Sequence, residues 1–311
     1  MRVVFFGTPA FAVPTLDALR SRHDLSLVVT QPDRPSGRGL DVRSSAVAAR
    51  AVTAGVEVIK PQRARDPELA ARIDAARPDV VVVAAYGQIL SRAMLEVAPH
   101  GAINVHASLL PRWRGASPIT AAILAGDPDT GVSIMRMDEG LDTGPVILRR
   151  VTAIGEDDAE SLSARLAELG AEALLEALDG IQAGTTEATP QPDLGVTYAR
   201  PVKKADGDLE WTLRAEEIER ALRAYRPWPG MRLPLGRERV QVVAGGPVPD
   251  WWVADGRADL PPGAVVEVNA EGIVVMTSST PFLVRRLKPA GKREMHAADF
   301  ARGRRDLVSA P

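Results

Sequence analysis

The chain has 311 residues, of which 45% are hydrophobic and 25% charged, a balance typical of a globular protein of one or two domains. Its formal net charge of −2 excludes a strong overall attraction to nucleic acid, and the absence of cysteine excludes disulfides and thiolate catalysis. Because no apolar run reaches the length of a membrane span and the N-terminus lacks a signal-peptide pattern, we expect a cytoplasmic protein.

The first thirty residues predict the start of a parallel α/β sheet. Residues 2–7 are an apolar run, and a Gly-Thr-Pro turn follows them. Phe11, Leu16 and Leu19 then recur at helical spacing over residues 10–22, and the chain returns as a strand. The first turn lacks the Gly-x-Gly-x-x-Gly sequence of dinucleotide-binding folds, so we expect no dinucleotide site.

Residues 31–45 predict a long irregular loop that contains two prolines and two glycines among Arg34, Arg38 and Arg43. Its glycines do not form a phosphate-binding P-loop, because no Gly-Lys-Ser or Gly-Lys-Thr follows them. Long loops in compact domains are usually functional. Four regular elements are predicted after it: a helix capped by Ser44 or Ser45, a strand at 56–59, a helix from Asp66, and a buried strand at 80–85.

Asn104 and His106 lie two residues apart on a predicted strand and therefore on one face of it. The strand breaks before Pro111, and ligands bind at such strand ends in open α/β sheets. An amide can donate to an oxygen that gains charge, and an imidazole can transfer a proton. Asp142, in a turn-rich segment, is the best candidate to orient the imidazole. On residue types alone, a structural histidine and a turn aspartate are an equally good interpretation.

The remaining elements predict two domains. A helix at 117–125, strands at 131–136 and 146–151, and a long helix at 159–183 complete a mixed sheet. A helix at 214–224 and four short strands between residues 239 and 287 suggest a small barrel. We predict a Rossmann-like doubly wound α/β domain over residues 1–189, a linker over 190–206 and an OB-like β-barrel domain over 207–311.

Lysine and arginine are crowded between residues 285 and 305, with Glu294 and Asp299 as the only acidic residues among them. Such a cluster can bind phosphates. On composition alone, a solvated surface is the more common role.

Two motifs resemble the signature of the formyltransferases that use 10-formyltetrahydrofolate. They are Asn-x-His-x-Ser-Leu-Leu-Pro-x-x-x-Gly at 104–115 and Met-Asp-Glu-Gly-Leu-Asp-Thr-Gly-Pro at 137–145. Gly-Thr-Pro-x-Phe-Ala at 7–12 and Pro-Trp-Pro-Gly at 227–230 narrow the resemblance to the branch that acts on initiator methionyl-tRNA. The resemblance runs from residue 1 to about residue 306, and it favours a catalytic over a structural role for Asn104, His106 and Asp142.

The resemblance implies formyl transfer to the α-amine of methionine on initiator tRNA, without a metal. Asn104 and a protonated His106 would stabilise the tetrahedral oxyanion, and Asp142 would orient His106; His106 acting as the base is the alternative. Phe11 would help to form the methionyl pocket. The folate would be held by the backbone of one segment and by one loop: Gln88, Ile89 and Leu90, and Ser108, Leu109, Leu110, Pro111 and Arg112.

The resemblance also implies a tRNA surface. The 31–45 loop would reach the acceptor stem of the tRNA. This loop departs from the lysine-rich loops of the family, and Asp41 lowers its positive charge. We expect Arg38 and Arg43 to contact the tRNA. Six further cations complete the predicted set: Lys203, Lys204, Arg285, Lys288, Lys292 and Arg293. We expect a monomer, because no long apolar stripe remains for a partner.

The nearest alternative is a formyltransferase that acts on an amino-sugar nucleotide and also carries a barrel-like second domain. The arginines of the 31–45 loop and the basic C-terminal stretch argue against it. A glycinamide ribonucleotide formyltransferase should end near residue 200. A folate- or RNA-binding protein without activity would not need Asn104, His106 and Asp142 together.

Overall fold

The computed structural model describes residues 1–36, 41–249, 260–304 and 307. The chain divides into two units. The first comprises Met1–Ile119, Pro128–Gly155 and Ser161–Arg200, and the second comprises Thr120–Asp127, Glu156–Glu160 and Pro201–Pro311. None of the helices in the described ranges is long and apolar enough to cross a bilayer.

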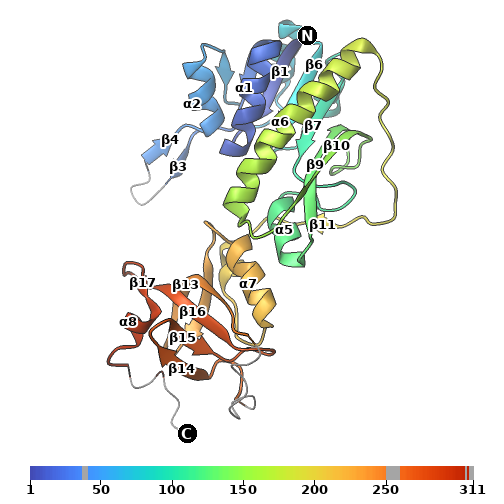
Figure 1. The fold of residues 1–311 in the computed structure, drawn as a ribbon. Helices are drawn as coiled ribbons and strands as arrows, with labels where there is room; N and C mark the ends of the chain where they lie inside the picture. The colour runs from blue at the N-terminus through green and yellow to red at the C-terminus, as the bar shows by residue number, and fades with distance from the viewer. Residues whose placement is uncertain (37–40, 250–259, 305–306, 308–311) are drawn as a thin grey trace. The chain divides into compact units, whose positions relative to one another are not determined.

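The first unit is built on a seven-stranded sheet in the order β10-β9-β7-β6-β1-β2-β5 (Figure 1). Five strands run parallel: β1 Arg2–Gly7, β2 Asp24–Val29, β5 Val58–Ile59, β6 Val80–Ala84 and β7 Ala102–His106. Two add antiparallel at one edge: β9 Asp129–Arg136 and β10 Val146–Ala153. The chain winds outward from β1 in one direction and from β6 in the other, so the strand order reverses between them. This arrangement confirms the predicted doubly wound, mixed sheet.

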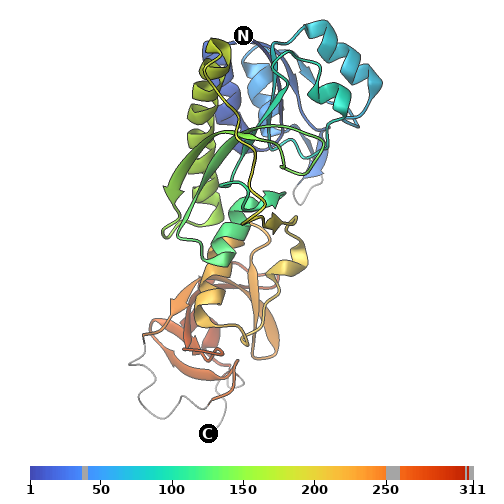
Figure 2. The same ribbon diagram turned by 90° about the vertical axis from the view of Figure 1, so that its right-hand side faces the viewer.

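Helices cover both faces of this sheet. They are α1 Val13–Arg22, α2 Ala46–Thr53, α3 Pro67–Ala76, α4 Arg92–Leu95 and α6 Ala159–Ala183. Most of α5 Pro118–Ala125 belongs to the second unit. α1, α2 and α6 lie on one side, and α3 and α4 lie on the other (Figure 2). Residues 3–6 of β1 are therefore all fully buried, because alternate side chains pack against the two helix layers.

Local sequence signals explain where two helices begin. The Ser45 hydroxyl accepts a hydrogen bond from the Ala48 N–H at 3.0 Å and caps α2. The Asp66 carboxylate accepts from the Glu68 N–H at 3.0 Å and caps α3. Both caps satisfy N–H groups that the first helical turn leaves without a partner, as the sequence predicted.

The prediction that residues 31–45 form an irregular loop was wrong. It contains a two-stranded hairpin in which β3 Arg34–Ser36 pairs antiparallel with β4 Asp41–Arg43. Strands of three residues are too short to show an alternating pattern, and Pro35 argued against a strand. A proline is tolerated there because a two-stranded ribbon has only edge strands.

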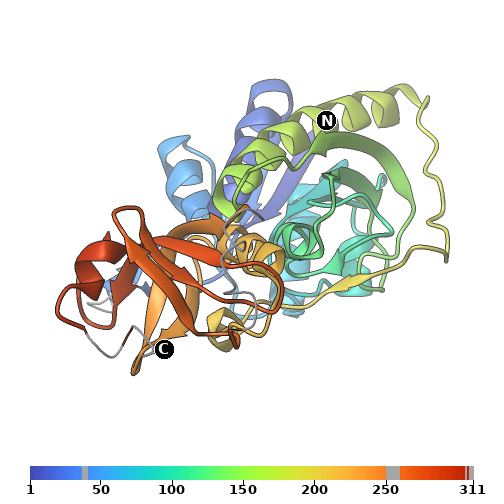
Figure 3. The ribbon, with the colours of Figure 1, turned by 60° about the horizontal axis from the view of Figure 1, so that its bottom comes forward.

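The second unit holds an antiparallel sheet in the order β12-β13-β16-β15-β14, with β17 beside β16 (Figure 3). Its strands are β12 Met231–Leu235, β13 Glu238–Pro247, β14 Val265–Asn269, β15 Gly272–Val275, β16 Phe282–Pro289 and β17 Met295–His296. α7 Ala215–Ala224 and α8 Ala297–Ala301 pack against this sheet. The predicted small OB-like β domain is confirmed as an antiparallel sheet domain, but the sequence missed β12, whose Pro234 argued against a strand.

Candidate active site

β7 carries Asn104 and His106 to the carboxyl edge of the sheet on the same face. Asn104 pairs with Val83 of β6, and His106 pairs with Ser133 of β9. Only 8% of Asn104 and 5% of His106 is exposed. Burying an amide or an imidazole without a hydrogen bond costs free energy of folding, so both groups should have partners. Those partners indicate what the two side chains can do chemically.

Asp142 joins the two side chains. Asn104 Nδ2 donates to Asp142 Oδ1 at 3.4 Å, and His106 Nδ1 lies 3.7 Å from Asp142 Oδ2. The same Oδ2 accepts the Gly115 N–H at 2.8 Å. The structure thus brings together the three side chains that the sequence selected, although they are up to 38 residues apart. Their catalytic roles stay a prediction.

The environment of His106 provides two acceptors. Its Nε2 lies 3.0 Å from the Trp113 carbonyl oxygen, while its Nδ1 faces Asp142. Each ring nitrogen thus faces an oxygen of the protein. Trp113 and Asp142 have φ angles of 60° and 52°, a region that residues other than glycine rarely adopt. Strained backbone on both sides of the imidazole indicates that the surrounding structure fixes these positions.

The predicted folate loop is tied down by hydrogen bonds. Ser108 Oγ donates to the Arg112 carbonyl at 2.6 Å. Ser133 Oγ donates to the Ser108 carbonyl at 2.7 Å and accepts from the Leu110 N–H at 3.1 Å. The side chains of Ser108 and Leu110 are buried, those of Leu109, Pro111 and Arg112 are half-buried, and the Arg112 guanidinium lies 4.4 Å from the centre of the Trp113 ring.

The other predicted folate segment follows β6 at the same sheet edge. Gln88 Oε1 accepts the Ala64 N–H at 2.7 Å, Ile89 is 66% exposed, and Leu90 is buried in the core. Phe11 lies half-buried in the 3₁₀ helix η1 Ala10–Ala12, directly after the first βα turn.

Tyr86 lies two residues after the end of β6, between that strand and this segment. Its carbonyl accepts from Thr8 Oγ1 at 3.1 Å and from Gln31 Nε2 at 2.7 Å, which ties the ends of β6, β1 and β2 together. Its ring packs edge-on against Phe6, with the ring centroids 5.1 Å apart. The hydroxyl is buried and has no hydrogen-bond partner within the described residues. Burial raises the pKa of Tyr86 to about 12.

Tyr86→Phe should therefore stabilise the protein by about 1 kcal/mol at neutral pH, because it removes a buried hydroxyl without a partner. Unfolded tyrosine ionises above pH 10, whereas native Tyr86 keeps its proton to about pH 12. The native state then binds more protons, so wild-type stability falls across this window and the advantage of the variant grows by about 1.4 kcal/mol per pH unit. Urea unfolding at pH 7 and pH 11 measures this difference. Tyr198→Phe, at an exposed position, is the control. Equal free energies of unfolding for wild type and Tyr86→Phe at both pH values would contradict the prediction.

The predicted tRNA-contacting residues occur in both units. Arg38 lies outside the described residues, and Arg43 is exposed at the end of β4. Within the second unit, Lys203 and Lys204 are exposed at the start of the 3₁₀ helix η2 Lys204–Gly207. The other four stand on β16 and on the turn between β16 and β17: Arg285, Lys288, Lys292 and Arg293.

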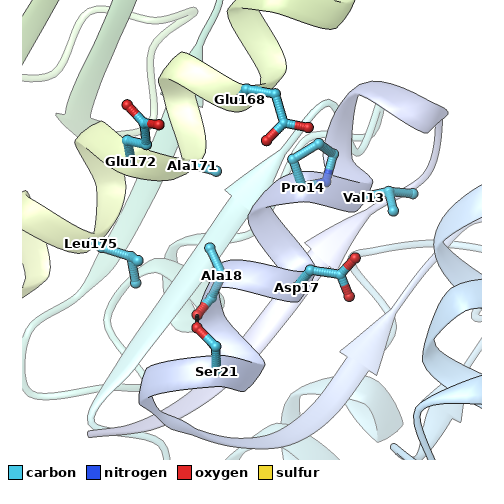
Figure 4. Close-up of a pocket in the computed structure, with 9 residues that line it drawn as sticks. All are labelled: Val13, Pro14, Asp17, Ala18, Ser21, Glu168, Ala171, Glu172 and Leu175. Atoms are coloured by element: carbon cyan, nitrogen blue, oxygen red, sulfur yellow. Dashed lines mark hydrogen bonds between the residues drawn. The ribbon is translucent and has the colours of Figure 1, made fainter.

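A hollow of about 470 Å³ lies between α1 and α6 (Figure 4). Asp17, Glu168 and Glu172 give it a partly acidic lining, and no predicted site residue is among those that line it. The hollow is on a helix-covered face of the sheet rather than at the carboxyl edge. Within the described ranges, no three His, Asp or Glu side chains are arranged to hold a metal ion.

Sequence reasoning missed three residues that support the site. Ser133 fixes the 108–112 loop, and Gln191 connects Arg114, two residues beyond that loop, to the backbone around Asp142. Each contact joins residues more than twenty positions apart, so no local pattern could have revealed it. The run Pro190-Gln191-Pro192 was visible only as a turn-rich part of a predicted linker.

Comparisons with known proteins cover both units. The model of the formyl transferase family matches residues 1–178, and the model of the formyl transferase C-terminal domain matches residues 201–305. The N-formyltransferase from Helicobacter canadensis, solved with folinic acid and dTDP-3-aminofucose, has a TM-score of 0.65. The match covers 91% of this chain and 98% of that one at 16% sequence identity, and it shows the fold alone.

Much higher sequence identity links the chain to one branch. It is 47% identical to the methionyl-tRNA formyltransferase of Anaeromyxobacter dehalogenans over 98% of this chain and 97% of that protein. It is 48% identical to the methionyl-tRNA formyltransferase of Halorhodospira halophila over 100% of this chain and 98% of that protein. With both family models and full-length relatives in agreement, the chain belongs to the methionyl-tRNA formyltransferase family.

Proposed function

We propose that Asn104, His106 and Asp142 form the centre at which this enzyme transfers a formyl group from 10-formyltetrahydrofolate to the α-amine of initiator methionyl-tRNA. The observation that carries the proposal is their convergence at the carboxyl edge of β7, in a chain of this family: Asn104 Nδ2 donates to the Asp142 carboxylate, and His106 Nδ1 lies 3.7 Å from it. In open α/β sheets this edge is where ligands bind.

The residues supply electrostatic stabilisation and proton handling. When the neutral amine attacks the formyl carbon, negative charge develops on the formyl oxygen. The C–N bond to the folate then breaks, and a proton replaces the formyl group on the folate nitrogen while the amine gives up one of its own. Asn104 Nδ2 has a second hydrogen besides the one that it donates to Asp142, and it is proposed to donate that hydrogen to the oxygen. A positively charged His106 is proposed to stabilise the same oxygen through its charge. Asp142 orients the ring and balances its charge, which accords with the two acceptors that face the imidazole nitrogens. His106 is therefore proposed as a stabiliser rather than as the initial base.

The folate is proposed to lie between residues 88–90 and the 108–112 loop. Because the Ser108 and Leu110 side chains point into the protein, the loop offers its backbone together with Leu109, Pro111 and Arg112. The exposed side chain of Ile89 provides apolar surface for a flat ring, and backbone groups of this segment can read its polar edge.

Residues 207–311 are proposed to bind the tRNA, with 1–189 as the catalytic domain and 190–206 as the linker. Support comes from the cations on β16 and the turn after it, since phosphate contacts dominate nucleic-acid affinity. Arg43, Lys203 and Lys204 are proposed to add contacts. We further propose that the enzyme acts as a monomer in the cytoplasm, where its tRNA substrate is charged.

Replacing both Lys292 and Arg293 by alanine should weaken tRNA binding and reduce the salt dependence of the affinity, with a decrease in the log–log slope of about 1 per lost phosphate contact. Titration of labelled tRNA at several salt concentrations measures both quantities. Arg72→Ala, an exposed cation of the first unit paired with Glu57, is the control. A slope equal to that of wild type would show that the β16–β17 turn does not contact phosphates.

Acceptor choice tests the proposed function. The purified protein is given 10-formyltetrahydrofolate and, separately, initiator methionyl-tRNA, elongator methionyl-tRNA or an amino-sugar nucleotide. We expect rapid formylation of the initiator tRNA, slow formylation of the elongator tRNA and none of the sugar. Formylation of the sugar amine instead of the tRNA would overturn the proposal.

A further inference from the structure

One amide side chain connects the backbone around Asp142 to the loop that carries Gly115. Gln191 Nε2 donates to the carbonyl oxygens of Asp142 and Gly144, each at 2.8 Å. Its Oε1 accepts from Arg114 Nη2 at 2.7 Å and from Arg114 Nε at 3.1 Å. Gln191 thus makes four hydrogen bonds to two segments that lie 47 to 77 positions away from it.

Chemistry allows only one orientation of this amide. A guanidinium has donors and no acceptor, whereas the two backbone carbonyls have acceptors and no donor. The amide oxygen must therefore face Arg114, and the NH₂ group must face the Asp142 segment. Arg114 is only 8% exposed, so its charge needs the acceptor that Gln191 provides.

The residue that this amide holds is under strain. Asp142 has a φ of 52°, and a Cβ on the nearby Gly144 would collide with the Arg136 carbonyl. On the opposite side, the Gly115 N–H holds Asp142 Oδ2 at 2.8 Å. The strand pair β8 Arg114–Gly115 and β11 Tyr198–Ala199 runs parallel and joins the Gln191 segment to the same loop. Backbone and carboxylate of Asp142 are thus fixed by a single connected network.

We propose that Gln191 is a positioning residue for formyl transfer: it fixes the backbone of Asp142 so that the carboxylate faces His106 and Asn104. The inference rests on the proposed function of Asp142. It gives a role to a residue outside the two signature motifs, in a segment that the sequence predicted to be only a linker. A displacement of about 1 Å at a catalytic group can cost about 10²-fold in rate.

Gln191→Glu tests this with almost no change in size. The carboxylate can still pair with Arg114, but it has no donor for the Asp142 and Gly144 carbonyls and repels them. We expect kcat to fall by about 10- to 100-fold, with KM for donor and acceptor changed by less than about twofold, because Gln191 is outside the residues proposed to bind the substrates. Leu194→Ala, an 89% exposed position of the same segment, is the matched control and should keep wild-type kcat.

A double-mutant cycle separates positioning from a general structural effect. If Gln191 acts through Asp142, adding Gln191→Glu to Asp142→Asn should lower kcat no further than Asp142→Asn alone. If kcat of the double variant is instead lowered by the product of the two single-variant factors, the proposal is overturned. Wild-type kcat in Gln191→Glu would also overturn it.

Hydrogen exchange provides a second readout that does not depend on activity. Gln191→Glu should speed exchange of the Gly115 amide by about tenfold, because its acceptor Asp142 Oδ2 becomes less well fixed. Exchange of the core strand β1 should stay unchanged in the same sample. Unchanged Gly115 protection would contradict the inference, whereas a wild-type protein that binds folate but forms no formylmethionyl-tRNA would contradict the proposed function alone.

Discussion

His106→Ala is expected to lower kcat for formyl transfer by about 10²- to 10⁴-fold, the range for a positioned proton donor or an oxyanion stabiliser. The KM values should change little, because the imidazole is 6% exposed and both of its nitrogens already face protein oxygens. The variant thus loses an interaction that strengthens only in the transition state. Such a loss lowers kcat and leaves substrate binding in the ground state intact. Steady-state kinetics with initiator methionyl-tRNA and 10-formyltetrahydrofolate measure it.

His100→Ala is the matched control, because His100 precedes the same strand and lies outside the Asp142 network in the described structure. It should keep wild-type kcat. A His106→Ala enzyme with a kcat within about threefold of wild type would exclude both the stabiliser and the base role, each of which is worth at least about 10²-fold. A loss confined to KM would instead indicate a binding role.

Asp142→Asn is expected to lower kcat by about 10²- to 10³-fold without unfolding the protein. The carboxylate offers two acceptor oxygens, which receive Asn104 Nδ2 and the Gly115 N–H and face His106 Nδ1. An amide of the same size offers one acceptor and turns an NH₂ group toward one of these donors. The imidazole loses its negative partner, and the strained loop loses a contact.

The control for Asp142→Asn is Glu139→Gln, which removes one negative charge three residues away at an exposed position. Kinetics at equal ionic strength and urea unfolding are measured for both variants. If both lower kcat equally, the effect comes from the net charge of the loop and not from the position of Asp142. If Asp142→Asn retains full kcat, Asp142 does not orient His106.

The sequence predicted those parts of the site that depend on local periodicity. Asn104 and His106 lie on one strand face because strand side chains alternate, and β7 ends at the carboxyl edge of the parallel part of the sheet because it runs parallel to β6. The caps Ser45 and Asp66 were likewise visible as short polar side chains before helical patterns. The proximity of Asp142 to His106 could only be hypothesised from residue chemistry, because the sequence of a turn does not show where its side chains lie relative to the sheet.

The parts that were missed depend on contacts between distant segments. Gln191 and Arg114 meet across 77 positions, and Ser133 holds Leu110 across 23. Neither contact leaves a periodic trace in one sequence. The hairpin of β3 and β4 and the edge strand β12 were missed for a different reason, because proline at an edge strand breaks the sequence pattern without breaking the sheet.

The most direct test of the central claim is a competition experiment. Wild type and His106→Ala receive 10-formyltetrahydrofolate labelled in the formyl carbon, together with equimolar initiator methionyl-tRNA and an amino-sugar nucleotide, and mass spectrometry locates the label. The label is expected on the methionyl amine with wild type and on neither amine, over the same time, with His106→Ala. Label on the sugar amine, or equal labelling of methionine by both proteins, would contradict the account.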